Sequence, residues 1–429
     1  MTTPRLVTPL DGPVNADVVV PGSKSHTNRA LLCAALAEGT SCLNGVLRAD
    51  DTAVMCSAVA ALVGGTGSLI LEGDSATMQG CAGSLAPGPH TFNVGLSGTT
   101  ARFLAPVLAA SGGDYVLDGE PPLRARPMGP AIEALRSLGV HITEEGAAGH
   151  LPIRFHAGRL AGSAVSISGD ESSQFLSGLL MAGPILASGL QITVDTTLVS
   201  APYVDLTVRT MRDFGATVVQ DGATYVVQPG GYRSPADDYQ IEPDASAASY
   251  FFAAAAICGG RVRVDGLGST TTQGDLAFAD VLASMGASVE RSATVTEVRG
   301  TGALQGVEVD MRDCSDTAQT LAAVAVFAST PTTVRGIGFI RRKETDRIGN
   351  VVGELRRCGI EAHEHDDGFT IVPGTPTSAV VETYDDHRMA MSFALLGLRS
   401  PGIQIADPEC VSKTFPGFWD ALDRLRPGN

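Results

Sequence analysis

The chain repeats itself, and an internal repeat constrains a fold more than any single motif does. One type of segment has the apolar spacing of a helix, then a glycine, then a short alternating strand. It occurs around Gly139, Gly215, Gly286 and Gly359, with a further copy ending near Gly64 and a truncated one at 418–425. Glycine at a helix end favours a left-handed cap, so each copy predicts a helix, a cap and a strand.

A second type of segment alternates with the first. It begins with small polar residues, continues as an apolar, alanine-rich helix and ends at Gly or Pro, as seen at 25–39, 99–112, 172–189, 245–259, 316–331 and 386–402. Successive ends lie roughly 70 residues apart, so six units account for the 429 residues. These helices are too apolar for a surface, and six units exceed one hydrophobic core. The repeat predicts an α/β protein with two groups of three units, divided near Tyr239–Asp244.

Composition indicates a stable globular protein in the cytoplasm. Hydrophobic residues make up 44% of the chain and charged residues 18%. The longest apolar run, 250–258, is shorter than the roughly 18 residues that span a bilayer, and predicts a buried helix. The N-terminus has no signal pattern, and the eight cysteines include no Cys-x-x-Cys pair. Scattered cysteines are typical of reduced thiols in a cytosolic protein.

The net charge of −16 argues against nucleic acid or an anionic membrane as a partner, because the field of the whole molecule repels phosphates. A site for small anions must then be built locally from clustered Lys and Arg. The first such cluster is Gly22-Ser23-Lys24-Ser25 followed by Arg29, at an expected helix start. A helix N-terminus attracts anions, so this cluster is a candidate phosphate site. In most isolated cases, however, such a pattern is only a capping serine beside a solvated lysine. The glycine spacing of a P-loop is not present.

Other polar segments carry both a structural and a functional interpretation. The charged run 341–347 could form a solvated helix face. Arg126 and Lys413 stand in turn-like contexts, where functional side chains are common. The run 363–367, His-Glu-His-Asp-Asp, falls in an expected exposed strand and turn, so we expect no metal site there. His387 lies at an expected helix start beside Arg388.

Taken together, seven segments resemble the signatures of the EPSP synthase family, in that family's order along nearly the whole chain. They are Gly22-Ser23-Lys24-Ser25 with Arg29, Gly98-Thr99, Arg126-Pro127, Ser172-Ser173-Gln174-Phe175-Leu176, Lys343-Glu344-Thr345-Asp346-Arg347, Tyr384-Asp385-Asp386-His387-Arg388-Met389-Ala390-Met391 and Lys413-Thr414-Phe415-Pro416. The fifth and sixth segments are the most specific.

The resemblance implies a fold of the enolpyruvyl transferase type, a two-domain inside-out α/β barrel with three repeats of about 70 residues per domain. The domains would be residues 1–22 with 243–429, and residues 23–242. It implies transfer of the enolpyruvyl group of phosphoenolpyruvate to the 5-hydroxyl of shikimate 3-phosphate, by addition and elimination in the interdomain cleft. Phosphate leaves by C–O cleavage, so we expect neither a metal nor an organic cofactor. We also expect a monomer.

The resemblance also implies roles for single residues. Asp316 matches the proton acceptor, Glu344 the proton donor to C3, and Lys24 a third catalytic group. Positions matching shikimate 3-phosphate ligands are Ser25, Arg29, Ser172, Ser173, Ser200, Tyr203, Asp316 and Lys343. Positions matching phosphoenolpyruvate ligands are Lys24, Gly98, Arg126, Gln174, Arg347, Arg388 and Lys413. His387 is also expected to bind substrate, without an assignment to either of the two. The sequence departs from the common family pattern at Leu96, Phe103 and Phe339.

Two other functions stay open at this point. The sister transferase that uses UDP-N-acetylglucosamine has the same fold and donor, but carries a reactive cysteine where residues 111–126 contain none. A non-catalytic anion-binding relative would be expected to lose the acid and the base, yet Asp316 and Glu344 are both present.

Overall fold

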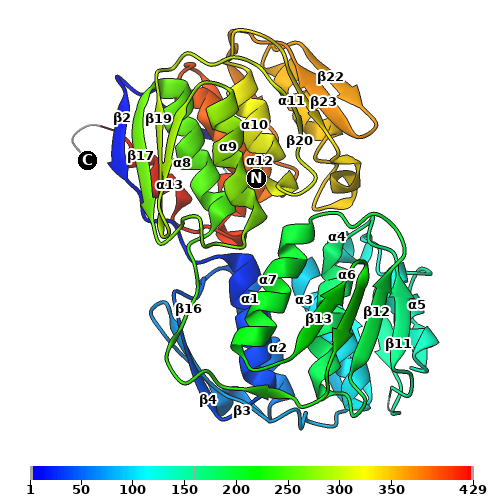
Figure 1. The fold of residues 1–429 in the computed structure, drawn as a ribbon. Helices are drawn as coiled ribbons and strands as arrows, with labels where there is room; N and C mark the ends of the chain where they lie inside the picture. The colour runs from blue at the N-terminus through cyan, green and yellow to red at the C-terminus, as the bar shows by residue number, and fades with distance from the viewer. Residues whose placement is uncertain (1–2, 159, 427–429) are drawn as a thin grey trace. The chain divides into compact units, whose positions relative to one another are not determined.

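The computed structural model describes residues 3–158 and 160–426. The chain forms two compact units, and Figure 1 shows the elements of each. Met1–Pro21 and Glu242–Asn429 make up one, here called the split unit, and Gly22–Ile241 makes up the other, here called the continuous unit. Each unit has its own hydrophobic core.

Five four-stranded sheets share one strand order. In each, an edge strand lies parallel to a second strand, which pairs antiparallel with the last strand of a hairpin. In the continuous unit the orders are β7(His90–Asn93)-β8(Tyr115–Asp118)-β10(Ile153–Phe155)-β9(Ile142–Glu144), β11(Ala164–Ile167)-β12(Leu190–Val194)-β14(Thr224–Val227)-β13(Val218–Asp221) and β16(Tyr239–Gln240)-β4(Thr40–Asn44)-β6(Ser75–Gln79)-β5(Leu69–Glu72). In the split unit they are β2(Val14–Asp17)-β17(Gly260–Asp265)-β19(Val295–Gly300)-β18(Ser288–Arg291) and β20(Glu308–Asp310)-β21(Thr332–Arg335)-β23(Gly368–Ile371)-β22(Ala362–His365).

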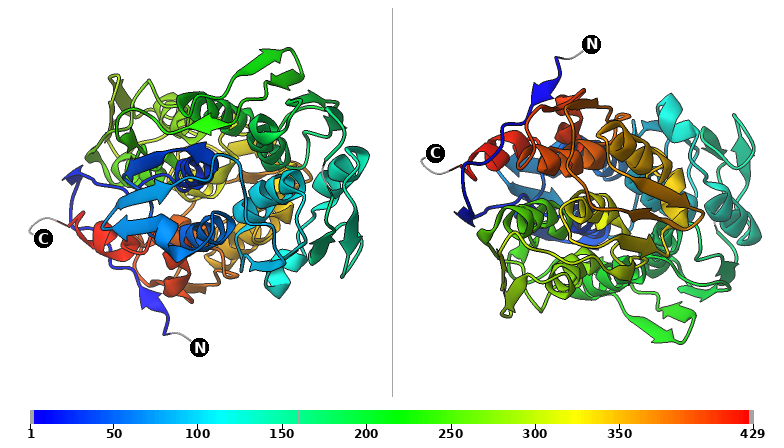
Figure 2. Two further views of the ribbon diagram at one scale, coloured as in Figure 1. Left: turned by 90° about the horizontal axis from the view of Figure 1, so that it is seen from below. Right: turned by 90° about the horizontal axis from the view of Figure 1, so that it is seen from above.

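A sixth sheet, in the split unit, begins with the same parallel pair but has three strands. Its order is β24(Ala379–Val381)-β25(Ile403–Ile405)-β1(Arg5–Leu6), so the N-terminal strand lies beside the C-terminal elements, as both views of Figure 2 show. A short parallel pair, β3(Ala37–Glu38) with β15(Tyr232–Arg233), completes the sheets described. The sixfold pattern read from the sequence thus reappears as six small sheets of related order.

The apolar helices of the second segment type are buried, as their composition predicts. They are α1(Lys24–Leu36), α3(Gly98–Ser111), α6(Ser173–Ala182), α8(Ala245–Cys258), α10(Ala318–Ala325) and α12(His387–Gly397). In α8 every residue except Cys258 is buried, which confirms the buried helix predicted at 250–258. Within the split unit α8, α10 and α12 pack on one another, and within the continuous unit α3 packs on α6.

The helices of the first segment type lead into the hairpins, and all of them except α2 are more amphipathic than the buried helices. They are α2(Asp50–Leu62), α5(Gly129–Ser137), α7(Ala201–Asp213), α9(Ala277–Ser284) and α11(Gly349–Arg357). Gly215 and Gly286 follow α7 and α9 with φ of +81° and +112°, which confirms the predicted left-handed ends. Shorter elements are α4(Pro121–Arg124), α13(Phe418–Asp423) and the 3₁₀ turns η1(Thr66–Ser68), η2(Gly183–Ile185), η3(Gly274–Leu276), η4(Ser315–Thr317), η5(Gly338–Arg342) and η6(Pro408–Lys413).

Two edge strands are exchanged relative to chain order. Elsewhere the parallel edge strand stands directly before the helix that leads to its partner strand, as in β7, α3 and β8. By that rule β2 would pair with β4, and β16 with β17. Instead β2 pairs with β17 in the split unit, and β16 pairs with β4 in the continuous unit. The chain therefore passes from one unit to the other at Pro21–Gly22 and at Ile241–Glu242.

The exchanged pairing of β2 depends on a glycine, which gives a first prediction. Gly260 has φ of +96°, and a Cβ atom there would lie 1.9 Å from the Val14 carbonyl oxygen. We expect Gly260→Ala to lower the free energy of unfolding by more than about 2 kcal/mol in a urea titration. Gly353, inside α11, has no atom within 4 Å of an added Cβ, so the control Gly353→Ala should raise it by roughly 0.5–1 kcal/mol. Equal changes in the free energy of unfolding for the two variants would contradict the close approach of Gly260 to β2.

All eight cysteines lie in the described residues and are free thiols. None of the helices described in residues 3–158 and 160–426 has the length and apolar character that crossing a membrane requires.

Candidate active site

The start of α1 carries the first cluster that the sequence singled out. The Ser23 hydroxyl accepts a hydrogen bond from the His26 backbone N–H and so caps the helix. The Lys24 ammonium lies 3.1 Å from Asp51 Oδ2 on α2, and both side chains are mostly buried. The capping serine is as expected, but the alternative of a solvated lysine is wrong, because Lys24 is held by a carboxylate.

Arg29 lies one turn further along α1 and is 1% exposed. Its guanidinium donates to Thr207 Oγ1 at 2.7 Å and to two backbone oxygens, of Ser25 at 2.8 Å and of Tyr203 at 2.9 Å. A longer contact of 3.4 Å reaches Ser177 Oγ. These partners are all neutral, and no carboxylate pairs with Arg29 among the described residues. Burial lowers the pKa of the guanidinium from 12.5 to about 10.

An aromatic ring covers one face of the same guanidinium. The carbon at the centre of the Arg29 guanidinium lies 4.9 Å from the centroid of the Phe103 ring, which is fully buried on α3. Such a cation–π contact stabilises a positive charge without neutralising it. Arg29 is therefore a buried, preorganised cation that matches an anionic ligand better than it matches its protein surroundings.

The starts of α3 and α6 bring three further predicted residues to one place. A Cβ atom on Gly98 would lie 2.9 Å from the guanidinium carbon of Arg126, so a side chain at position 98 would displace Arg126. Gln174 accepts from Arg102 Nη1 at 2.8 Å and donates to Thr99 Oγ1 at 3.1 Å. Arg126 is 9% exposed and lies in a turn, as the sequence predicts.

The remaining predicted residues of the continuous unit lie at the starts of α6 and α7. Ser172 caps α6 by accepting from the Gln174 backbone N–H, and Ser173 is the first residue of that helix. Ser200 precedes α7 in the left-handed region with φ of +53°. Tyr203 follows on α7, and its carbonyl oxygen holds Arg29. Ser25, Arg29 and Tyr203 are thus joined by direct contacts, while Gln174 contacts the start of α3 and Ser172 contacts Gln174.

In the split unit a buried ion-pair network surrounds Arg347. Its side chain is 2% exposed and contacts Asp386 twice, at 2.7 Å from Nε and 3.2 Å from Nη2. It also lies 2.8 Å from Glu344 and 3.1 Å from Asp316. Although burial alone would lower the pKa of the Arg347 guanidinium, the carboxylates of Asp386, Glu344 and Asp316 together raise it above its ordinary value.

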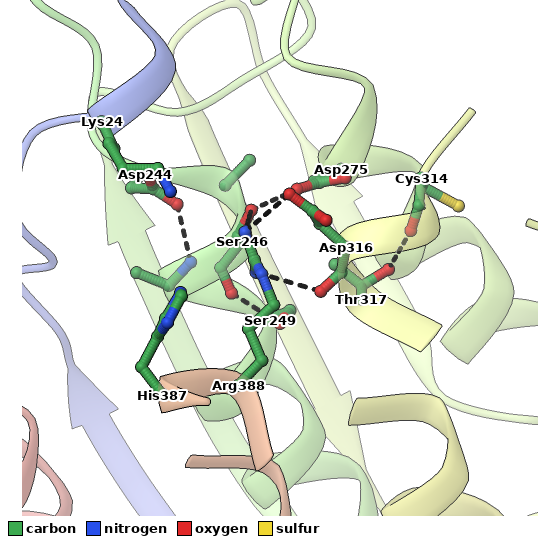
Figure 3. A network of polar contacts seen from close by, with 12 residues as sticks. Lys24, Asp244, Ser246, Ser249, Asp275, Cys314, Asp316, Thr317, His387 and Arg388 are labelled. Atoms are coloured by element: carbon green, nitrogen blue, oxygen red, sulfur yellow. Dashed lines mark hydrogen bonds and ion pairs between the residues drawn. The ribbon is translucent and has the colours of Figure 1, made fainter. Parts of the chain in front are cut away.

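Arg388 and Lys413 complete this network. Arg388 donates to Asp316 Oδ2 at 2.7 Å and to the Asp316 carbonyl oxygen at 3.0 Å, as Figure 3 shows. Lys413, at the end of η6, lies 3.6 Å from Glu344. Asp316, Glu344, Arg347, Arg388 and Lys413 therefore form one connected group, drawn from segments separated by up to about a hundred residues. The alternative of a solvated helix face at 341–347 is wrong, because Arg347 is buried and the run contains no α-helix, only the end of the 3₁₀ turn η5 at 341–342.

Two predicted residues of the split unit have other surroundings. Lys343 follows η5, and its ammonium lies 5.7 Å from the centroid of the Phe339 ring. His387 is the first residue of α12 and is 1% exposed, with Nδ1 3.7 Å from Asp386 Oδ1. The run 363–367 forms part of β22 and the turn after it, as expected, and its Glu364 pairs with Arg341 at 2.7 Å.

Several residues of these networks were not predicted from the sequence. Asp51 holds Lys24, Thr207 holds Arg29, and Asp386 both caps α12 and holds Arg347. Asp386 had one usable signal, since an aspartate directly before a helix is a common cap. Asp51 and Thr207 had none, because their partners lie far away in the sequence.

Comparison with known proteins gives a consistent result. The family model described as EPSP synthase (3-phosphoshikimate 1-carboxyvinyltransferase) matches residues 10–422. A 3-phosphoshikimate 1-carboxyvinyltransferase of Nostoc punctiforme is 46% identical over 412 residues, which cover 96% of each chain. One from Methanoculleus marisnigri is 43% identical over 96% of this chain and 97% of the relative.

Solved structures agree with the sequence relatives. An EPSP synthase from Acinetobacter baumannii matches with a TM-score of 0.83 and 27% identity over 99% of this chain and 98% of the other. The enolpyruvyl transferase NikO from Streptomyces tendae has a TM-score of 0.75 at 19% identity, over 98% and 97%, and so shares the fold. These matches confirm the resemblance read from the seven sequence segments. The chain belongs to the EPSP synthase family and has its 3-phosphoshikimate 1-carboxyvinyltransferase activity.

Proposed function

We propose that the buried Arg29 binds the phosphate of shikimate 3-phosphate. The observation that carries this proposal is a cation, 1% exposed, whose described partners are all neutral. Placing a charge there is costly unless an anion joins it, and a guanidinium fork suits a phosphate group. Ser25, Ser172, Ser173, Ser200, Tyr203 and Lys343 would supply the other contacts to this substrate.

We propose that phosphoenolpyruvate is held by the basic groups around Gly98 and Arg347. The ligands would be Lys24, Gly98, Arg126, Gln174, Arg347, His387, Arg388 and Lys413. Phosphoenolpyruvate carries a carboxylate and a phosphate, and arginine binds both in a bidentate manner. The absence of a side chain at Gly98 supports this assignment, because it leaves the Arg126 guanidinium close to the helix start.

In the proposed mechanism Asp316 takes the proton of the 5-hydroxyl while that oxygen forms a bond to C2 of phosphoenolpyruvate. Glu344 gives a proton to C3 in the same addition. The tetrahedral intermediate then loses phosphate by cleavage of the bond between C2 and the phosphate oxygen, and C3 returns a proton to the Glu344 carboxylate, which restores the double bond. Lys24 would neutralise the charge that develops on the departing phosphate. Contacts of Asp316 with Arg347 and Arg388 keep its carboxylate oriented before the reaction.

The test is phosphate release from phosphoenolpyruvate with shikimate 3-phosphate as acceptor, and with UDP-N-acetylglucosamine as the control acceptor. We expect release with the first acceptor alone, and we expect Asp316→Asn to lower kcat by about 10²- to 10⁴-fold, since a general base contributes that much. The matched control is Asp313→Asn, which changes an exposed aspartate three residues earlier and should retain the parent rate. Equal rates for the Asp316→Asn variant and the parent would rule out the assigned base.

We also propose that each unit is a domain of three repeats, with helices inside and sheets outside. The domains would be residues 1–22 with 243–429, and 23–242. The common order of five sheets and the burial of six apolar helices support this inside-out arrangement. We propose a cytoplasmic location, which the eight free thiols support. We also propose a monomer, for which light scattering should report a mass near 44.1 kDa.

A further inference from the structure

A buried serine and aspartate lie directly behind Arg388. Ser246 is the second residue of α8, and Asp275 lies in η3. Both are buried, with 8% and 2% of their surfaces exposed. The Ser246 hydroxyl donates to Asp275 Oδ2 in a short hydrogen bond, and Arg388 Nη2 approaches the same Ser246 oxygen at 3.4 Å (Figure 3).

The direction in which each hydrogen bond is donated follows from the chemistry of the three side chains. A serine hydroxyl has one proton, and a carboxylate can only accept, so the proton of Ser246 points at Asp275. The lone pairs of Ser246 are then left for a donor, and Arg388 provides the guanidinium N–H. Asp275 thereby fixes Ser246 as an acceptor toward Arg388.

Capping of α8 does not account for this arrangement. The side chain of Asp244 already accepts from the Ala247 backbone N–H at 2.9 Å and caps that helix. Ser246 lies inside the first turn, and its hydroxyl is directed to a side chain from η3 rather than to the backbone of its own helix. A buried serine–carboxylate contact that ends on an arginine of the candidate site indicates a role in orienting that arginine.

We propose that Asp275 is a positioning residue for phosphoenolpyruvate binding, acting through Ser246 on Arg388. The proposal deepens the function proposed above and rests on the assignment of Arg388 to phosphoenolpyruvate. Asp316 holds one side of the Arg388 guanidinium, through its carboxylate and its carbonyl oxygen, and Ser246 contacts it as well. When Asp316 accepts a proton during the reaction its hold on Arg388 weakens, and Ser246, fixed by Asp275, keeps the guanidinium in place.

Two substitutions break the chain of contacts at different links. Asp275→Asn is nearly isosteric, but an amide can donate to Ser246, which lets the serine proton turn toward Arg388 and repel it. Ser246→Ala removes the link and leaves the carboxylate. We expect each to raise the KM for phosphoenolpyruvate and to lower kcat/KM for it by about 10- to 100-fold, by analogy with the effect of removing residues that orient metal ligands. The KM for shikimate 3-phosphate should change less than twofold, roughly within measurement error for an untouched site.

The double variant tests whether both residues act through one path. In a double-mutant cycle, Asp275→Asn in the Ser246→Ala background should have little further effect, because the link is already absent. Asp280→Asn is the matched control, since Asp280 is an exposed aspartate of neighbouring α9 that pairs with Arg291, and surface pairs contribute little. This control should keep the parent KM for both substrates.

The outcomes separate the positioning role from a purely structural one. A structural role would reduce the fraction of active protein and so lower kcat with both KM values unchanged. That result, or independent and additive effects of the two substitutions, would overturn the proposal. If Asp275→Asn does not fold, as judged by circular dichroism and a cooperative thermal transition, the KM change in Ser246→Ala decides. An unchanged KM for phosphoenolpyruvate in Arg388→Ala would instead reject the proposed function of Arg388 itself.

Discussion

The Arg29→Met variant should lose turnover and yet unfold at the same urea concentration as the parent protein, or a higher one. Arg29 is buried among hydroxyls, backbone oxygens and the Phe103 ring, and none of these neutralises its charge. Methionine fills similar space without that charge, and Thr207 can still donate to the Tyr203 carbonyl oxygen at 2.9 Å. Replacing buried ion pairs by well-packed apolar side chains of similar volume is often neutral or stabilising by about 1–4 kcal/mol, and the same desolvation argument applies to the single charge of Arg29.

The difference in stability between the parent protein and Arg29→Met should depend on pH, because the pKa of Arg29 differs between the folded and unfolded chains. Burial lowers that pKa from 12.5 to about 10 in the folded protein. Between these values the unfolded chain holds the proton more tightly, so the stability of the parent rises with pH through that window. Below pH 10 the folded parent carries the full penalty of the buried charge. The stability advantage of Arg29→Met should therefore be greatest below pH 10 and diminish above it.

Affinity measurements supply the other half of this test. Isothermal titration with shikimate 3-phosphate should show a loss of at least about 100-fold in affinity for Arg29→Met, since charge-assisted contacts to a phosphate are strong. The control is Arg48→Met, which removes an exposed arginine of the same unit and should leave both affinity and stability unchanged. A strongly destabilised Arg29→Met variant with normal affinity would mean that Arg29 holds the fold and not a ligand.

Asp386→Asn should reduce the free energy of unfolding by about 3–5 kcal/mol, because it leaves a buried guanidinium without its nearest carboxylate. Asp386 is fully buried and contacts Arg347 with both oxygens while accepting from the Arg388 backbone N–H. The amide keeps the shape but can no longer accept twice from Arg347. Activity should fall with stability, since Arg347 and Arg388 both depend on this side chain.

The adjacent residue provides the control for this prediction. Asp385 is exposed and has φ of +58°, a conformation that asparagine tolerates as well as aspartate does. Asp385→Asn should therefore change the urea midpoint very little. Chemical unfolding followed by tryptophan fluorescence suits both variants, because Trp419 is buried in the split unit. Equal effects of the two substitutions would show that the buried network around Arg347 contributes nothing particular to stability.

The local structure could be predicted well from the sequence because its causes are local. Ser23, Ser97, Ser172, Asp244 and Asp386 each accept a backbone hydrogen bond at the helix start that the small polar residues indicate. The glycines after the amphipathic helices have the predicted left-handed conformation. Helix periodicity, helix capping and glycine conformation each depend on a few neighbouring residues, so they can be predicted from the local sequence.

The side-chain networks could not be predicted in this way, because their causes are long-range. No residue near Lys24 in the sequence indicates that Asp51 is its partner. Arg347 stands in a run of alternating charges that is typical of a solvated helix face, although it is among the most buried large side chains. The candidate site residues were named through motifs shared with a family, whereas partners such as Asp51 and Thr207 lie outside those motifs. Parallel pairing of β2 with β17 joins residues more than two hundred positions apart, and its register comes from packing in three dimensions.

The exchanged edge strands also determine the order in which the molecule can be completed as it is synthesised. All strands of the continuous unit have been synthesised once Ile241 has been added, so its sheets can form while the rest of the chain is still being made. Strand β2 must wait for β17, and β1 must wait for β25 at 403–405. Strand β1, which is made first, is thus among the last to find its partner, and a ribosome-bound chain would keep β1 unpaired until synthesis is nearly finished.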